Sequence, residues 1–97
     1  MYRAEFSFDP RIEQKRLESL CKKTDKLFEA EGILCEKTAF GKRIYCTDGS
    51  GKNDFARMWA AIFGMKDDIK IADALVTAIW QHNDIRENMI GEFFLCE

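Results

Sequence analysis

The spacing of the apolar residues changes at Asp9-Pro10, and this change limits the possible folds more than any other feature of the sequence. From Tyr2 to Phe8 every second residue is apolar, which is the period of a strand with one buried face. Over about residues 10–31 the apolar residues recur every three or four positions, which predicts an amphipathic helix. A strand followed by such a helix requires a sheet that the helix can cover.

Local residues define both ends of this predicted helix. Asp9 is a suitable N-cap, because its carboxylate can accept hydrogen bonds from unpaired backbone N–H groups, and Pro10 fits the first helical position. Gly32 can adopt the left-handed conformation that commonly ends a helix.

The segment at residues 33–47, ILCEKTAFGKRIYCT, is typical of a β-hairpin. Gly41-Lys42 suits a two-residue type II′ turn, whose first central residue needs a positive φ. This turn pairs Phe40 with Arg43 and Thr38 with Tyr45. The predicted core face carries Ile33, Cys35, Lys37, Ala39, Ile44 and Cys46, and the predicted outer face carries Leu34, Glu36, Thr38, Phe40 and Tyr45.

Two further helices and a terminal element are expected after the hairpin. Residues 55–63 carry an apolar stripe at helical spacing, and Gly64 can end that helix. Asp67 or Asp68 can cap another helix. Its apolar stripe would comprise Ile71, Ala72, Leu75, Val76, Ile79 and Trp80. For residues 84–97 we predict a helix and keep a strand as the alternative, because both periods fit the apolar residues there.

Together these elements predict a single α+β domain over residues 1–97. Their order is β-α-β-β-α-α followed by the C-terminal element, which suits a small antiparallel sheet with helices packed on one face. If the last element is a strand, the order approaches the split βαβ, ferredoxin-like sandwich, which is the alternative fold. A chain of 97 residues leaves no room for a second core.

The stretch YCTDGSGKND, residues 45–54, has the glycine, serine and lysine of a phosphate-binding loop but not their spacing. Asn53 follows Gly51-Lys52 where a Ser or Thr should bind magnesium, and Cys46 stands in place of the first glycine. A calcium loop that starts at Asp48 would have Trp59 where a bidentate glutamate belongs. We therefore interpret this stretch as a connection in which Asn53 or Asp54 caps the next helix.

The cysteines and the single histidine do not form a recognisable catalytic or metal-binding pattern. The chain has no C-x-x-C, and the spacing of Cys21, Cys35, Cys46 and Cys96 matches no zinc motif. We expect the first three thiols to face inward as small apolar groups and His82 to lie near a helix C-terminus. The sequence thus predicts no catalytic residue, no metal site and no cofactor.

The N-terminus carries charges within its first few residues and has no continuous apolar run, so it predicts neither a signal peptide nor a membrane anchor. We expect a cytoplasmic protein with reduced cysteines and no membrane partner.

Charge is distributed unevenly along the chain and suggests nucleic acid as one class of partner. Residues 1–52 have eleven Lys and Arg against nine Asp and Glu, whereas residues 53–97 have four against eight. A basic surface could follow phosphates if its cations share one side. The candidates are Lys15, Arg16, Lys22, Lys23, Lys26, Lys42, Arg43 and Lys52. Acidic residues on the same helix oppose this reading, and no RNA-recognition signature is present.

A protein partner is the interpretation that we favour. The outer hairpin face would expose Leu34, Phe40 and Tyr45 beside Lys42 and Arg43, and tyrosine and arginine commonly anchor interfaces. Asp67, Asp68 and Asp73 belong to the acidic C-terminal half, which could dock on a protein built to hold nucleic acid. A second copy of the chain could also cover the apolar patch, so a homodimer is an open alternative.

In its overall profile the chain resembles small accessory proteins of phages and mobile elements, of the anti-CRISPR and anti-defence inhibitor type. The similarity lies in length, acidic C-terminal half and lack of catalytic signatures, not in a motif. It implies a non-enzymatic module that binds and occludes a bacterial nucleic-acid enzyme. The alternative function is that of a small nucleic-acid-binding accessory protein that uses the basic helix and the hairpin loop.

Overall fold

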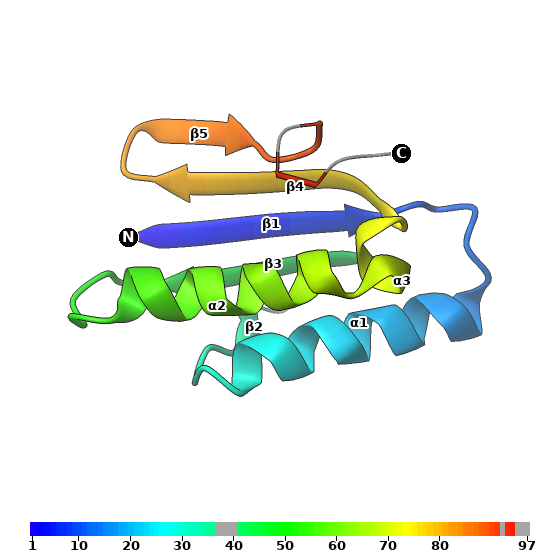
Figure 1. The fold of residues 1–97 in the computed structure, drawn as a ribbon, viewed down its shortest axis with the longest axis horizontal. Coiled ribbons are helices and arrows are strands. Elements are labelled where there is room, and N and C mark those ends of the chain that lie inside the picture. The colour runs from blue at the N-terminus through cyan, green and yellow to red at the C-terminus, as the bar shows by residue number, and fades with distance from the viewer. Residues whose placement is uncertain (37–40, 92, 95–97) are drawn as a thin grey trace.

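The chain forms five strands and three helices in the computed structural model, which describes residues 1–36, 41–91 and 93–94. In chain order the elements are β1 (Tyr2–Phe8), α1 (Gln14–Glu29), β2 (Cys35–Glu36), β3 (Lys42–Thr47), α2 (Asp54–Asp67), α3 (Ile69–Ala72), β4 (Leu75–His82) and β5 (Ile85–Asn88). The strands form one antiparallel sheet in the order β2-β3-β1-β4-β5. Figure 1 shows α1 and α2 side by side on one face of this sheet, so the predicted α+β class is confirmed.

Strand β1, which its strict alternation predicted, lies at the centre of the sheet. It pairs with β3 on one side and with β4 on the other. Ala4, Phe6 and Phe8 are almost completely buried beneath the helices. Arg3, Glu5 and Ser7 point to the opposite face, which no described helix covers. The period of two therefore places the apolar residues of β1 on the face that the helices cover.

The connections follow the alternative fold. The run β1-α1-β2-β3-α2-β4 with sheet order β2-β3-β1-β4 is the split βαβ arrangement, and β5 extends it at one edge. The first long connection runs from β1 to the edge strand β2, the second runs from β3 to β4, and the two helices that they carry contact each other.

Helix α1 is shorter than the predicted span of about 10–31. Asp9 does not cap it: its carboxylate instead accepts the backbone N–H of Arg11 at 2.9 Å and closes a turn before the helix. The predicted C-terminal signal is confirmed, because Gly32 has φ 77° and the N–H of Ile33 reaches the carbonyl of Phe28.

The predicted hairpin register is wrong in the described part of the hairpin. Tyr45 lies opposite Cys35, not opposite Thr38, and it points into the core. The physical reason is its large ring, which stacks on Phe28 with centroids 3.7 Å apart, while its hydroxyl donates to Asp25. Ile44 and Cys46, predicted to be inward, alternate with Tyr45 and therefore lie on the uncovered face. The predicted pairs of residues 37–40 lie outside the described residues.

Helix α2 continues past Gly64, so the predicted stop is wrong. Gly64 instead lies where α1 approaches most closely: a Cβ atom there would be 2.9 Å from Cδ2 of Leu27. The missing side chain thus favours helix–helix contact, and this contact compensates for the low helix propensity of glycine.

The predicted helix through Trp80 is also wrong, because α3 ends at Ala72 and residues 75–82 form β4. Asp68 does cap α3, as expected, by accepting the N–H of Lys70 at 3.0 Å. The branched and aromatic residues of this segment fit a strand as well as a helix, so their pattern alone does not fix its secondary structure. Pairing with β1 stabilises the strand. A register shift opposite Ser7 and Phe8 leaves Val76 exposed, whereas Ala78 and Trp80 face the helices.

Residues 85–88 form the edge strand β5, which contradicts the predicted helix and agrees with the alternative. Asn83 has φ 54°, a left-handed conformation that asparagine tolerates, and it lies in the short turn between β4 and β5. Met89 and Phe94 after this strand are buried against the core. Residues 92 and 95–97 lie outside the described residues.

Substitutions of Val76 and Ala78 test whether residues 75–82 form the strand β4 or the helix that the sequence predicted. In the structure Ala78 is completely buried and Val76 is about half exposed, whereas the helical stripe would have buried Val76 and exposed Ala78. Ala78→Lys should therefore lower the free energy of unfolding by at least about 3 kcal/mol, and Val76→Lys should change it by only about 0.5 kcal/mol. Urea unfolding of the two variants measures this, and the reverse order would contradict the β4 assignment.

Candidate functional site

The glycine-rich loop before α2 is occupied by carboxylates of the chain itself. Asp54 is 5% exposed, accepts the N–H of Gly51 at 3.2 Å and pairs with Arg57 at 3.1 Å. Asp48 accepts the backbone N–H of Ser50 at 2.9 Å, and this bond lowers the pKa of Asp48. Asp54 therefore lies where a bound phosphate would compete for the same N–H and the same arginine. The interpretation of this loop as a connection agrees with this geometry. The predicted side-chain cap is wrong, because Asn53 stands at the N-cap position of α2 without a side-chain cap hydrogen bond and Asp54 bonds to Gly51 before the helix.

An open hollow lies beside this loop, between residues 32–34 and the end of β3. Arg57 spans it, donating from Nε to the carbonyl of Glu31 at 2.7 Å as well as pairing with Asp54. The hydroxyl of Thr47 is buried at its wall without a hydrogen-bond partner among the described residues. Asp48 and Asp54 on the same wall disfavour an anion there, because two carboxylates would repel it.

In the part of the chain that the structure describes, each thiol has a raised pKa, which disfavours the nucleophilic thiolate. Burial raises the pKa of Cys21 and of Cys35, and it raises the pKa of Cys46 to about 11. Cys21 and Cys35 pack against the core as predicted, whereas Cys46 lies on the uncovered face of the sheet. Cys96 lies outside the described residues.

His82 ends a strand and not a helix, contrary to prediction. Its ring packs on Tyr2 with centroids 4.5 Å apart. Within residues 1–36, 41–91 and 93–94, no group of three His, Cys, Asp or Glu residues is placed to hold a metal ion.

The structure does not assemble the hairpin patch that the sequence predicted as a partner site. Leu34 is 73% exposed, but Tyr45 is completely buried. Lys42 pairs with Glu5 at 2.9 Å, and Arg43 donates to Asp25 from Nε at 3.1 Å. The remaining member, Phe40, lies outside the described residues.

The three predicted acidic partner residues lie near one end of the helical layer but do not form a continuous acidic surface. Asp67 is exposed at the end of α2, and Asp73 is exposed after α3. Asp68 is occupied by its capping bonds, and its Oδ2 lies 4.0 Å from Nζ of Lys23. A nearby lysine therefore interrupts this part of the surface.

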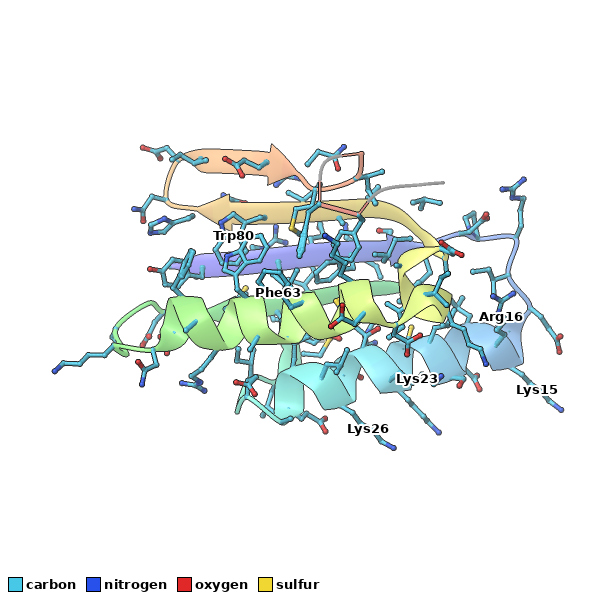
Figure 2. All side chains as sticks on the ribbon, viewed as in Figure 1. Lys15, Arg16, Lys23, Lys26, Phe63 and Trp80 are labelled. Atoms are coloured by element: carbon cyan, nitrogen blue, oxygen red, sulfur yellow. The ribbon has the colours of Figure 1, made fainter. Side chains whose placement is uncertain are left out.

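Part of the predicted basic set does share one side. Four lysines of α1 line a shallow hollow together with Glu18 and Ser19: Lys15, Lys22, Lys23 and Lys26. Figure 2 shows Lys15, Lys23 and Lys26 pointing away from the sheet. The hairpin cations do not join them, because Lys42 and Arg43 are held at Glu5 and Asp25.

On the uncovered face of the sheet, Glu5 is the centre of a charge cluster. Its carboxylate is 8% exposed and lies 2.9 Å from Lys42, 3.5 Å from Arg86 and 3.6 Å from Arg3. The hydrogen bond from Lys42 is the main cause that lowers the pKa of Glu5. Lys42 on β3 pairs with Glu5 on β1, and Arg86 on β5 reaches Glu5 across β4. These cations therefore help to hold the strands of the sheet together.

A continuous aromatic cluster between α2 and β4 was not predicted as a unit. Neighbouring rings in it have centroids 4.5 to 6.3 Å apart. Trp59 is central, lying 5.1 Å from Trp80 and stacked on Phe93 at 5.3 Å. Figure 2 shows Phe63 and Trp80 in this region. The members are Tyr2, Phe55, Trp59, Phe63, Trp80, His82 and Phe93.

The outward side of α2 continues this cluster into solvent. Phe55 and Phe63 are 52% and 55% exposed, and Ala56 and Ala60 are exposed as well. Between Asn53 and Lys66 the only charged residues are Asp54 and Arg57, which pair with each other. A helix that is apolar on all sides is normally covered on all sides. We call Phe55, Ala56, Ala60 and Phe63 the α2 surface.

A signal for this surface is present in the sequence. The segment FARMWAAIF, residues 55–63, has one charged residue, so its apolar stripe is too wide for one flat sheet to cover. The apolar stripe predicted over residues 55–63 includes Phe55 and Phe63 together with Met58, Trp59 and Ile62. In the structure α1 packs against α2 at Gly64, and both phenylalanine rings stay about half exposed.

No family model, curated protein or solved structure matches the chain. None of the helices in the described residues is long and apolar enough to cross a membrane.

Removing the Asp54 side chain should leave the N–H of Gly51 and the guanidinium of Arg57 available to an anion. We expect Asp54→Ala to lower the free energy of unfolding by about 1–3 kcal/mol, because the N–H of Gly51 and Arg57 lose a buried partner. Inorganic phosphate should then recover part of the loss in thermal unfolding, whereas the wild-type chain should respond equally to phosphate and to chloride of the same ionic strength. Asp48→Ala is the matched control. Strong stabilisation of the wild-type chain by phosphate would contradict this account of the loop.

Proposed function

We propose that the chain is a non-catalytic protein-binding module and that its partner docks on the α2 surface. The observation that carries the proposal is that two phenylalanines two turns apart on one helix, Phe55 and Phe63, are each about half exposed. Aromatic anchors of this kind dominate the energy of protein interfaces.

Burying the exposed half of a phenylalanine side chain contributes roughly 1 kcal/mol, so the two rings supply about 2 kcal/mol to any partner that covers both. The methyl groups of Ala56 and Ala60 lie on the same side and add apolar area without bulk. Large exposed apolar patches on soluble domains commonly mark docking sites.

The rings are also held in place before a partner arrives. Phe55 contacts Tyr2 and Trp80, and Phe63 contacts Trp59 and Phe93. Because these neighbours restrict the rotamers in the free chain, binding loses less side-chain entropy than it would with isolated rings.

Charges near the surface favour a partner with a polar rim. Nζ of Lys66 lies 4.5 Å from the centre of the Phe93 ring, and Asp67 is exposed beside it. An apolar centre bordered by charges is the usual organisation of a protein interface. The narrower expectation, an inhibitor of a bacterial nucleic-acid enzyme, depends only on the resemblance in overall profile and stays a prediction.

The lysines of α1 support a second candidate, nucleic-acid binding. Four of them line one hollow, with Glu18 as the one acid there. Such a surface would bind DNA or RNA with a strong dependence on salt. It ranks second because exposed lysines are common on solvated helices, whereas half-exposed aromatic pairs are not.

A photo-crosslinker placed on the α2 surface tests the protein-binding proposal. With p-benzoylphenylalanine at position 63, irradiation of the producing cells should capture a protein, and the added substitution Phe55→Ser should weaken the capture severalfold. The same probe at Leu34 or Ile69 is the matched control, because these side chains are 73% and 69% exposed but lie outside the α2 surface. Equal capture at all three positions, or none at position 63, would contradict the proposal.

A further inference from the structure

The exposed residues of α2 follow the spacing of a helix–helix seam. Ala56, Ala60, Phe63 and Asp67 stand at i, i+4, i+7 and i+11, which is the repeat that keeps one side of a helix against a partner helix. All four are exposed. Arg57 does not interrupt this seam, because its guanidinium is directed to the carbonyl of Glu31 after α1 and to Asp54 at the beginning of α2.

The two ends of the seam carry opposite charges. Lys52 is exposed just before α2 begins, and Asp67 is exposed at its last residue. Between them the seam is uncharged. An interface between two identical copies must be self-complementary about a twofold axis, so a surface with one positive and one negative end fits an inverted copy of itself.

One antiparallel register satisfies charge and shape together. If Lys52 lies opposite Asp67 of a second α2, then Phe63 lies opposite Ala56 of that helix. The large ring thus meets a small side chain, twice by symmetry, and the twofold axis passes between Trp59 and Ala60. Ala60 beside the axis has a small side chain, which lets the two helices approach closely there. Antiparallel helix dipoles favour the same arrangement.

We infer that the partner on the α2 surface is a second copy of this chain, bound through an antiparallel pair of α2 helices in this register. The inference rests on the proposed function of the α2 surface as a docking site. Figure 1 shows no described element in front of α2, so the second helix has free access. A 14-residue helix is about 21 Å long, and the contact is therefore small. We expect a dimer that dissociates on dilution.

Charge exchange at the ends of the seam tests the register. Lys52→Asp and Asp67→Lys each place two like-charged pairs in the homodimer and should raise its dissociation constant about tenfold. A mixture of the two variants restores both opposite-charge pairs in the heterodimer, which should return to within about threefold of the wild-type value. Sedimentation equilibrium measures all three, with Lys15→Asp on α1 as the matched control that should leave association unchanged.

Both substitutions add a charge that suits its helix end, so they should not impair folding, and circular dichroism verifies this. A wild-type chain that stays monomeric at about millimolar concentration, well above the working range of weak interfaces, would overturn the inference. Single variants and their mixture that associate equally would overturn it too. If the chain is monomeric but the probe at position 63 still captures another protein, the self-pairing fails and the proposed function stands. If the probe captures nothing, the proposed function fails.

Discussion

Helix α2 carries more apolar surface than the described part of the chain covers, and the neighbouring elements are arranged around the part that is buried. The sheet covers Met58, Ile62 and Met65, and α1 covers the flank at Gly64. Among the described residues, the rings of Tyr2, Trp80 and Phe93 pack on the opposite flank. Because a surface helix normally keeps a polar side, the apolar outward residues of α2 support the proposed docking site.

The charged groups of the domain are largely used to hold its layers together. Arg43 and the hydroxyl of Tyr45 connect β3 to Asp25 of α1, and burial raises the pKa of that hydroxyl. Arg57 with Asp54 fastens the beginning of α2 to the end of α1. Since these partly buried polar groups satisfy each other, they stabilise the arrangement of the helices.

Elements with local signals could be predicted from the sequence, and elements decided by distant contacts could not. The alternation of β1 and the Gly32 end of α1 depend on neighbouring residues, and both are confirmed. The strand β4 and the inward orientation of Tyr45 depend on β1 and on Phe28, which are far away in the sequence. The α2 surface was missed for the same reason. The width of its apolar stripe is visible in the sequence, but the part that stays exposed depends on where α1 packs.

The reactivity of the exposed rings inside the cell tests the central claim most directly. In hydroxyl-radical footprinting, Phe55 and Phe63 should be modified several times more slowly in living cells than in the dilute purified chain, because a partner covers them. Leu34, which is exposed elsewhere, should give the same relative rate in both samples. Equal rates for Phe55, Phe63 and Leu34 in cells and in dilute solution would show that the α2 surface stays open to water and would contradict the account.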